Sequence, residues 1–254
     1  MKRKKKRLGN KKMDLMTIVC CTPDKPERRE HMRARCLREG LEPRFTTDMG
    51  LFVHKDSPEC AALKGSFPQN PAFKAHYLTY IRALQYFIST GRAYLLLLED
   101  DIVRTDGGSV SVERIIADAP PFDLLFLEYC YASCWSRVFA APGYAKGLRA
   151  QCTGACVYSL EGARAFFAFT ASRHMVIDWL TPLYAATVRG HERTLYLSPP
   201  AFKQDRSLFA DGVSGAGETG FLPVCAGLAV SLGPLALLAA LGLALAALHT
   251  STAP

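Results

Sequence analysis

The pattern of apolar and polar positions between residues 13 and 210 changes repeatedly between two forms. Short apolar runs, typical of buried strands, occupy residues 15–21, 93–98, 122–128 and 155–160. Helical patterns occupy residues 26–40, 72–90 and 161–172. The clearest of these helices, 72–90, is expected to end at Gly91. Strands that alternate with helices predict an α/β sandwich with a mostly parallel sheet.

Residues 226–248 form an apolar stretch unlike the rest of the chain. Ser231 is its only polar side chain, and no charged residue lies between Glu218 and His249. At about 1.5 Å per residue, a helix of this length spans a bilayer. The sequence therefore predicts a C-terminal transmembrane helix, with a buried core helix as the alternative. The Gly-rich residues 211–225 would link this helix to a domain at 13–210.

Basic residues gather at the N-terminus. Residues 1–12 hold eight of the 31 Lys and Arg residues and no acid, so the rest of the chain carries 23 basic and 23 acidic residues. We expect 1–12 to be a solvated, disordered tail, and we expect no specific nucleic-acid partner. A targeting signal, or contact with anionic lipid or nucleic acid, is the alternative use of this tail. The positive-inside bias predicts a single-pass membrane protein whose main domain is cytoplasmic.

Nine cysteines allow two interpretations. Cys130 and Cys134, and again Cys152 and Cys156, have the spacing C-x3-C, which would suit a zinc site with four thiolate ligands. The favoured interpretation is buried free thiols in a reducing compartment, because the count is odd and the chain is large enough to build a core.

Three consecutive carboxylates, Glu99, Asp100 and Asp101, directly follow four leucines. Ligands of α/β sheets bind outside the carboxyl ends of strands, where these acids would repel one another and lose hydration. A divalent cation, Mg²⁺ or Mn²⁺, would relieve that repulsion. Alternation along an extended chain places Glu99 and Asp101 on one side and Asp100 on the other. A solvated acidic turn is the alternative.

The acid cluster is one of a series of motifs that follow one another in a fixed order over residues 15–208. They are Pro26-Glu27-Arg28-Arg29 after the first strand, His76 preceded by Ala75, Leu97-Leu98-Glu99-Asp100-Asp101, the strand at 122–127, Thr153-Gly154-Ala155-Cys156-Val157-Tyr158-Ser159 with Gly162-Ala163, Val176-Ile177-Asp178-Trp179-Leu180, and Pro199-Pro200 with Gln204 and Ser207. This series resembles glycosyltransferase family 25, which includes lipooligosaccharide and collagen galactosyltransferases. The chain departs from that pattern at Ala75 and Met175, where the family has serine and proline.

The resemblance implies a GT-A-like three-layer sandwich and an inverting, metal-dependent transfer of galactose or glucose. The donor would be a UDP-sugar, and the acceptor a hydroxyl of a glycan, lipid or protein. Glu99 and Asp101 would hold Mn²⁺ or Mg²⁺, which neutralises the leaving diphosphate. Asp178 would be the catalytic base, with Asp205 as second choice.

Other residues have weaker assignments. Arg28, His76 and Asp100 would contact the donor. The guanidinium of Arg28 suits a phosphate group. Asp123 is expected to begin a strand without a catalytic role. The remaining residues have alternative structural explanations, an exposed helix face or core packing; they are Arg29, Tyr158 and Trp179.

Two further functions compete with transfer. A catalytically inactive, membrane-anchored α/β binding protein is compatible with Ala75 and Met175. A phosphohydrolase or nucleotidyltransferase using the same acids is disfavoured, because the chain has neither a P-loop nor an H-E-x-x-H motif.

Overall fold

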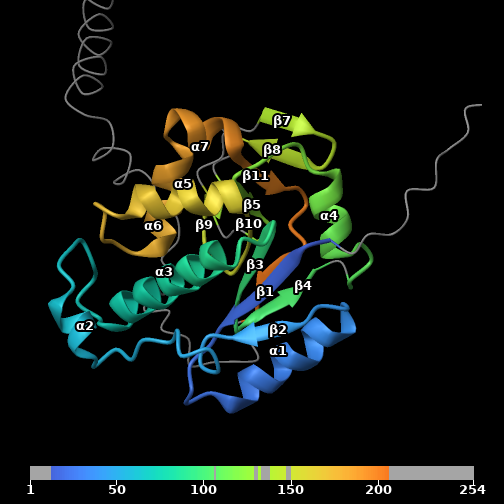
Figure 1. Ribbon diagram of the computed structural model, residues 1–254. Coiled ribbons are helices and arrows are strands. Elements are labelled where there is room, and N and C mark those ends of the chain that lie inside the picture. The colour runs from blue at the N-terminus through green and yellow to red at the C-terminus, as the bar shows by residue number, and fades with distance from the viewer. Residues whose placement is uncertain (1–12, 106, 129–130, 133–137, 147–149, 206–254) are drawn as a thin grey trace, which may run out of the picture. The chain divides into compact units, whose positions relative to one another are not determined.

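The computed structural model describes residues 13–105, 107–128, 131–132, 138–146 and 150–205 (Figure 1). By its internal contacts the chain divides into Met1–Ala210 and Asp211–Pro254, and every described residue belongs to the first unit. The predicted basic tail, Gly-rich linker and transmembrane helix therefore lie outside the described residues. Within the described part of the chain, each helix is too short or too polar to cross a membrane.

The described residues form one large sheet with helices on both faces. The sheet has eight strands in the order β2-β1-β3-β10-β5-β11-β8-β7 within these residues. Their bounds are β1 Leu15–Cys20, β2 Pro43–Phe45, β3 Tyr94–Glu99, β5 Leu124–Phe126, β7 Val138–Ala141, β8 Tyr144–Lys146, β10 Ala155–Ser159 and β11 Thr194–Leu197. Two small antiparallel sheets pair β4 (Ile102–Arg104) with β12 (Phe202–Gln204), and β6 (Tyr131–Ala132) with β9 (Ala150–Gln151).

The strand pairings make the large sheet mixed. β2, β1, β3, β5, β11 and β7 run in one direction, whereas β10 and β8 run in the other. The prediction of a mostly parallel sheet is confirmed for strand direction. The antiparallel placement of β10 between β3 and β5 was not predicted.

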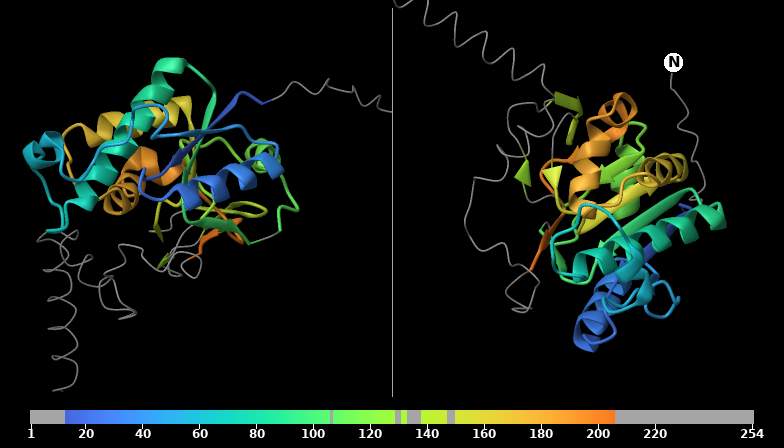
Figure 2. Two further views of the ribbon diagram at one scale, coloured as in Figure 1. Left: turned by 90° about the horizontal axis from the view of Figure 1, so that it is seen from below. Right: turned by 90° about the vertical axis from the view of Figure 1, so that its left-hand side faces the viewer.

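Alternation along the strands supplies two cores. In β3, Leu95 and Leu97 pack on one face of the sheet, and Leu96 and Leu98 pack on the other. The first face is covered by α3 (Ala72–Thr90), α5 (Leu160–Thr170) and α6 (Ile177–Ala185). The second is covered by α1 (Pro26–Arg38) and α4 (Val112–Asp118). Figure 2 shows the two helical layers on either side of the sheet. The short helices α2 (Pro58–Ala62) and α7 (Val188–Arg193) complete the helical elements of the described residues.

Predicted and observed elements agree best where periodicity is strong. The helix at 72–90 has the predicted bounds, and Gly91 ends it with a left-handed φ of 69°. The strands predicted at 15–21 and 155–160 each end one residue earlier, in β1 and β10. The strand predicted at 122–128 is too long, since β5 comprises only Leu124–Phe126.

The order of strands creates a topological switch point at β1. From β1 the chain passes through α1 on one face to β2, and later through α3 on the other face to β3. β2 and β3 therefore lie on opposite sides of β1, and the helices that lead to them cover opposite faces of the sheet. Sheets of this kind bind ligands in the crevice at such a point.

Asp123 lies at the opposite, amino-terminal end of β5 and is fully buried. Its carboxylate accepts hydrogen bonds from Arg189 Nε at 2.6 Å, Tyr184 Oη at 2.8 Å and Arg193 Nε at 3.2 Å. Burial alone would raise the pKa of Asp123, but these donors hold it below its ordinary value. Asp123 was expected to begin a strand; it lies directly before β5, and its contacts are those of a structural residue.

Replacing Asp123 with asparagine should lower the free energy of unfolding by about 2–4 kcal/mol near neutral pH, because two arginines lose their buried partner. The pKa of Asp123 is lower in the folded state than the value of about 3.9 expected when unfolded. Its stabilising effect is therefore complete above that pH and is lost as the pH falls through the folded-state value. Urea unfolding at several pH values measures this.

Asp118→Asn is the matched control, because Asp118 is exposed and pairs with Arg114 one helical turn away. Its cost should stay within about 0.5 kcal/mol. Equal costs for the two variants at neutral pH would show that the buried network does not stabilise the fold.

Candidate active site

The three consecutive acids lie where β3 ends. Asp100 turns toward α1, where its Oδ1 accepts a hydrogen bond from Arg28 Nη1 at 3.1 Å. Both residues are at most 9% exposed. Burial raises the pKa of Asp100, although the adjacent guanidinium acts in the opposite direction. The alternative of a solvated turn is therefore wrong for Asp100. Asp100 and Asp101 lie in a turn after β3, so the alternation predicted for an extended chain does not apply to them.

Glu99 is held by side chains from three other parts of the chain. Thr153 Oγ1 donates to Glu99 Oε1 at 3.1 Å, and Gln204 Nε2 donates to Glu99 Oε2 at 3.2 Å. His76 Nε2, from α3, lies 3.7 Å from Glu99 Oε1. Thr153 precedes β10 and Gln204 ends β12. Residues far apart in sequence thus converge on one carboxyl group.

Asp178 lies in the first turn of α6 and reaches the same hydroxyl. Its Oδ1 is 3.1 Å from Thr153 Oγ1, so Thr153 lies between Asp178 and Glu99. A threonine hydroxyl has a single proton to donate. Both contacts are hydrogen bonds at the same time only when one of the two acids is protonated. The N-cap residue of α6 is Val176, so Asp178 does not cap this helix.

The electrostatics of this cluster favour neutral forms. Burial raises the pKa of Glu99 well above its ordinary value, and the charges of Asp101, Asp178 and Glu128 raise it further. Burial lowers the pKa of His76, although Asp178 and Asp101 act against this. Since burial disfavours the charged forms of both Glu99 and His76, their 3.7 Å contact is not a strong ion pair.

Glu128 was missed by the sequence analysis. It follows β5, is 2% exposed, and its Oε2 accepts a hydrogen bond from the backbone N–H of Gly154 at 3.1 Å. A Cβ at Gly154 would lie 2.8 Å from that oxygen, so a larger residue there would displace the Glu128 carboxylate. The available signal was the acid directly after an apolar strand, the same signal that identified Glu99.

The donor set of the cluster suits a hard cation. Carboxylate oxygens are the ligands of Mg²⁺ and Mn²⁺, which often take only one or two from the protein and the rest from water and phosphates. Among the described residues, no group of three His, Cys, Asp or Glu side chains has the arrangement of a complete metal cage. Glu99 and Asp101 therefore fit a shared ion only if the substrate completes its coordination.

The cysteines do not form the alternative zinc site. Cys152 is disulfide-bonded, whereas Cys156 is a buried free thiol. The other described cysteines, Cys20, Cys21, Cys36 and Cys60, are also free, and Cys130 and Cys134 lie outside the described residues. The prediction of free thiols is correct for Cys156 and wrong for Cys152.

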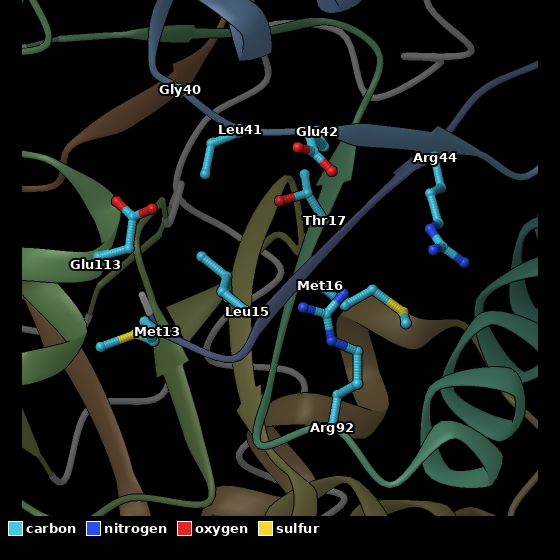
Figure 3. Close-up of a pocket in the computed structure, with 10 residues that line it drawn as sticks. All are labelled: Met13, Leu15, Met16, Thr17, Gly40, Leu41, Glu42, Arg44, Arg92 and Glu113. Atoms are coloured by element: carbon cyan, nitrogen blue, oxygen red, sulfur yellow. The ribbon is translucent and has the colours of Figure 1, made fainter. Parts of the chain in front are cut away.

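Two cavities lie near the amino-terminal ends of the strands, opposite the acid cluster. One of about 60 Å³ adjoins the start of β1, where Leu15, Thr17, Arg44 and Arg92 line it (Figure 3). Another of about 340 Å³ adjoins Tyr94 at the start of β3. Neither is lined by the acids at the carboxyl ends. We place the candidate site at the acids, because side chains with perturbed pKa values converge there.

The remaining candidates have mixed outcomes. Arg29 pairs with Asp48 on the exposed side of α1, as its structural explanation requires. Tyr158 is buried, and its hydroxyl lies 2.9 Å from that of Tyr80. Trp179 is 45% exposed, so the expectation of core packing is wrong. The backbone N–H of Asp205 donates to the Asp101 carbonyl at 2.7 Å, and Ser207 lies outside the described residues.

Comparisons with known proteins give only distant similarity. No protein-family model and no curated protein matches this chain. The crystal structure of a glycosyltransferase involved in the glycosylation of the major capsid of PBCV-1 aligns over 76% of this chain and 96% of its own, with 10% identity and a TM-score of 0.44. A mannose-1-phosphate geranyltransferase from Thermus thermophilus aligns over 73% and 74%, with 11% identity and a TM-score of 0.38. Similarity at this level carries no information about the chemistry of this chain.

In the presence of a chelator that removes divalent ions, Glu99→Gln should be more stable than wild type. This difference in stability should grow as the pH rises from about 5 to about 8. The pKa of Glu99 is raised in the folded state. Its favourable contribution is present below the unfolded value of about 4.3 and is lost as the pH rises toward the folded-state value. Thermal unfolding of variant and wild type across this range tests the effect.

Glu59→Gln serves as the control, because Glu59 is exposed and pairs with Arg82. Its unfolding temperature relative to wild type should not change with pH in that range. A pH-independent difference for Glu99→Gln as well would contradict the raised pKa.

Proposed function

We propose that this chain is a metal-dependent, inverting glycosyltransferase with a GT-A-like fold, which moves galactose or glucose from a UDP-sugar to an acceptor hydroxyl. The observation that carries the proposal is the position of the acid cluster. Glu99 is the last residue of β3 and Glu128 follows β5, so both lie at the carboxyl ends of strands near the switch point at β1. His76, Asp178 and Gln204 reach this cluster from three other elements.

The motif residues support the same proposal. His76, Glu99, Thr153, Asp178 and Gln204 belong to motifs spread over more than half of the chain, and each lies within hydrogen-bond or close electrostatic range of another. Core packing alone would place apolar residues here, because buried like charges destabilise a fold. A site that must bind a cation and a diphosphate explains their retention.

In this proposal, Asp101 and Glu99 hold Mn²⁺ or Mg²⁺. When bound, the ion neutralises charge that develops on the leaving diphosphate. Protonation of Glu99, which burial favours, competes with the ion for the same oxygens. Asp100 and Arg28 fix the loop after β3 against α1 through their ion pair, and so shape the donor side of the crevice.

Asp178 is the proposed general base. An acceptor hydroxyl oxygen attacks the anomeric carbon, the bond from that carbon to the diphosphate oxygen breaks, and Asp178 takes the hydroxyl proton. With both acids ionised, the single proton of the Thr153 hydroxyl would be donated to Asp178, 3.1 Å away, and would orient it. His76, whose pKa burial lowers, is available as a neutral hydrogen-bonding partner for the donor.

Residues 226–248 are proposed to anchor this enzyme in a membrane, as their apolar composition predicts. The disulfide at Cys152 is more typical of an oxidising compartment than of the cytosol. We therefore propose the anchor without the cytoplasmic orientation that the charge pattern predicts. The acceptor in this proposal is a glycan, lipid or protein that presents a free hydroxyl on the enzyme's side of that membrane.

Asp101→Asn should lower the hydrolysis of UDP-galactose or UDP-glucose by the full chain with Mn²⁺ by about 100-fold or more, because the ion and the diphosphate lose a ligand. The same variant should lose the rise in unfolding temperature that Mn²⁺ gives the wild type. Circular dichroism verifies that the fold is kept. Asp56→Asn, an exposed carboxylate beside His54, is the control and should behave as wild type.

If the wild type hydrolyses no UDP-sugar and Mn²⁺ does not stabilise it, the binding-protein alternative is favoured. Hydrolysis that is equal in Asp101→Asn and wild type would show that the metal assignment is wrong.

A further inference from the structure

The short link between β9 and β10 runs through the acid cluster. It consists of Cys152, Thr153 and Gly154. The Thr153 hydroxyl oxygen lies 3.1 Å from Glu99 Oε1 and 3.1 Å from Asp178 Oδ1. The Gly154 carbonyl accepts a hydrogen bond from the Glu99 N–H at 2.8 Å. The link therefore contacts two of the acids that have a chemical role in the proposed function.

Cys152 has an unusual backbone conformation. Its φ is 81°, in the left-handed region, and among the residues that the structure describes it is the only non-glycine residue with a positive φ. A residue with a Cβ adopts this region at a cost and keeps it only when its surroundings hold it there. Asn and Asp tolerate the region because their side chains hydrogen-bond locally, which a cysteine side chain does poorly. A restraint from outside the residue therefore holds Cys152 in this conformation.

The covalent restraint at this position is the disulfide of Cys152. The residues on either side are held by hydrogen bonds instead. β9 pairs with β6 as far as Gln151, and the Gly154 N–H donates to Glu128 Oε2 at 3.1 Å. Cys152 directly precedes Thr153, so a change in the φ of Cys152 reorients the backbone that carries the Thr153 hydroxyl. The disulfide thus fixes the one torsion in the link that a cysteine would not adopt unaided.

We infer that the disulfide of Cys152 is a positioning element of the site, which holds the Thr153 hydroxyl between Glu99 and Asp178. This inference rests on the proposed function. Reduction by a dithiol breaks the S–S bond. The dithiol gives up two electrons and two protons, becomes a cyclic disulfide, and leaves one thiol on Cys152 and one on its partner cysteine. Cys152 then relaxes to a negative φ, and the enzyme loses activity although its acids are unchanged.

The test compares the oxidised and the reduced full chain in detergent. Dithiothreitol reduces the protein and is removed under nitrogen before Mn²⁺ and UDP-galactose or UDP-glucose are added. Hydrolysis by wild type should fall about tenfold or more on reduction, because small displacements of catalytic groups slow a reaction strongly. It should return on reoxidation. Mass spectrometry verifies that reduction releases the thiol of Cys152, and circular dichroism verifies that the fold is kept.

Two substitutions separate positioning from stabilisation of the fold. Both remove the disulfide, but glycine adopts a positive φ without steric cost, whereas alanine does not. Cys152→Ala should resemble reduced wild type, and Cys152→Gly should hydrolyse the UDP-sugar several-fold faster than Cys152→Ala. Neither variant should respond to dithiothreitol. Cys60→Ser is the matched control, because Cys60 is a free thiol in α2, and it should lose activity on reduction as wild type does.

The results separate this inference from the proposed function. A free thiol at Cys152 in the purified wild type, or hydrolysis that is unchanged when this thiol is released, overturns the positioning role and leaves the proposed function intact. Equal losses of activity in Cys152→Gly and Cys152→Ala also overturn it, because they show that the disulfide only stabilises the fold. Absence of hydrolysis in oxidised wild type overturns the proposed function, and with it this role of Cys152.

Discussion

Repulsion among partly buried carboxylates around Glu99 is the constraint on which the carboxyl ends of the strands depend. Asp101, Asp178 and Glu128 all raise the pKa of this one group, which burial has already raised. The protein offsets the repulsion with neutral donors, a threonine hydroxyl and a glutamine amide. Asp100 is the exception, because it has the guanidinium of Arg28. The carboxyl ends are therefore built to accept further positive charge.

The sequence predicted most of the layer structure, because strong periodicity survives folding. α3 and β3 are found where their patterns place them, and the two faces of β3 follow from simple alternation. The direction of β10 was not predictable, since an apolar run has the same pattern in either direction. β5 comprises only Leu124–Phe126 of its predicted apolar run, because an apolar run does not mark where backbone pairing ends.

The candidate site was predicted in part. Motif positions supplied Glu99, Asp178 and His76, and the structure brings these together. The ion pair of Arg28 with Asp100 joins residues 72 positions apart, so no local pattern indicates it. Glu128 was overlooked because a single acid after a strand is a weak signal. The exposure of Trp179 depends on how α6 is rotated against the core, which its composition does not determine.

The two ends of β5 have opposite electrostatic characters. Asp123, at the amino end, accepts hydrogen bonds from two arginines. Glu128, beyond the carboxyl end, adds negative charge near Glu99, whose pKa is raised by neighbouring carboxylates. Three residues of strand separate them. A directed-evolution library that randomised the amino end would mainly recover folding defects, while one at the carboxyl end would recover altered substrates on an intact scaffold.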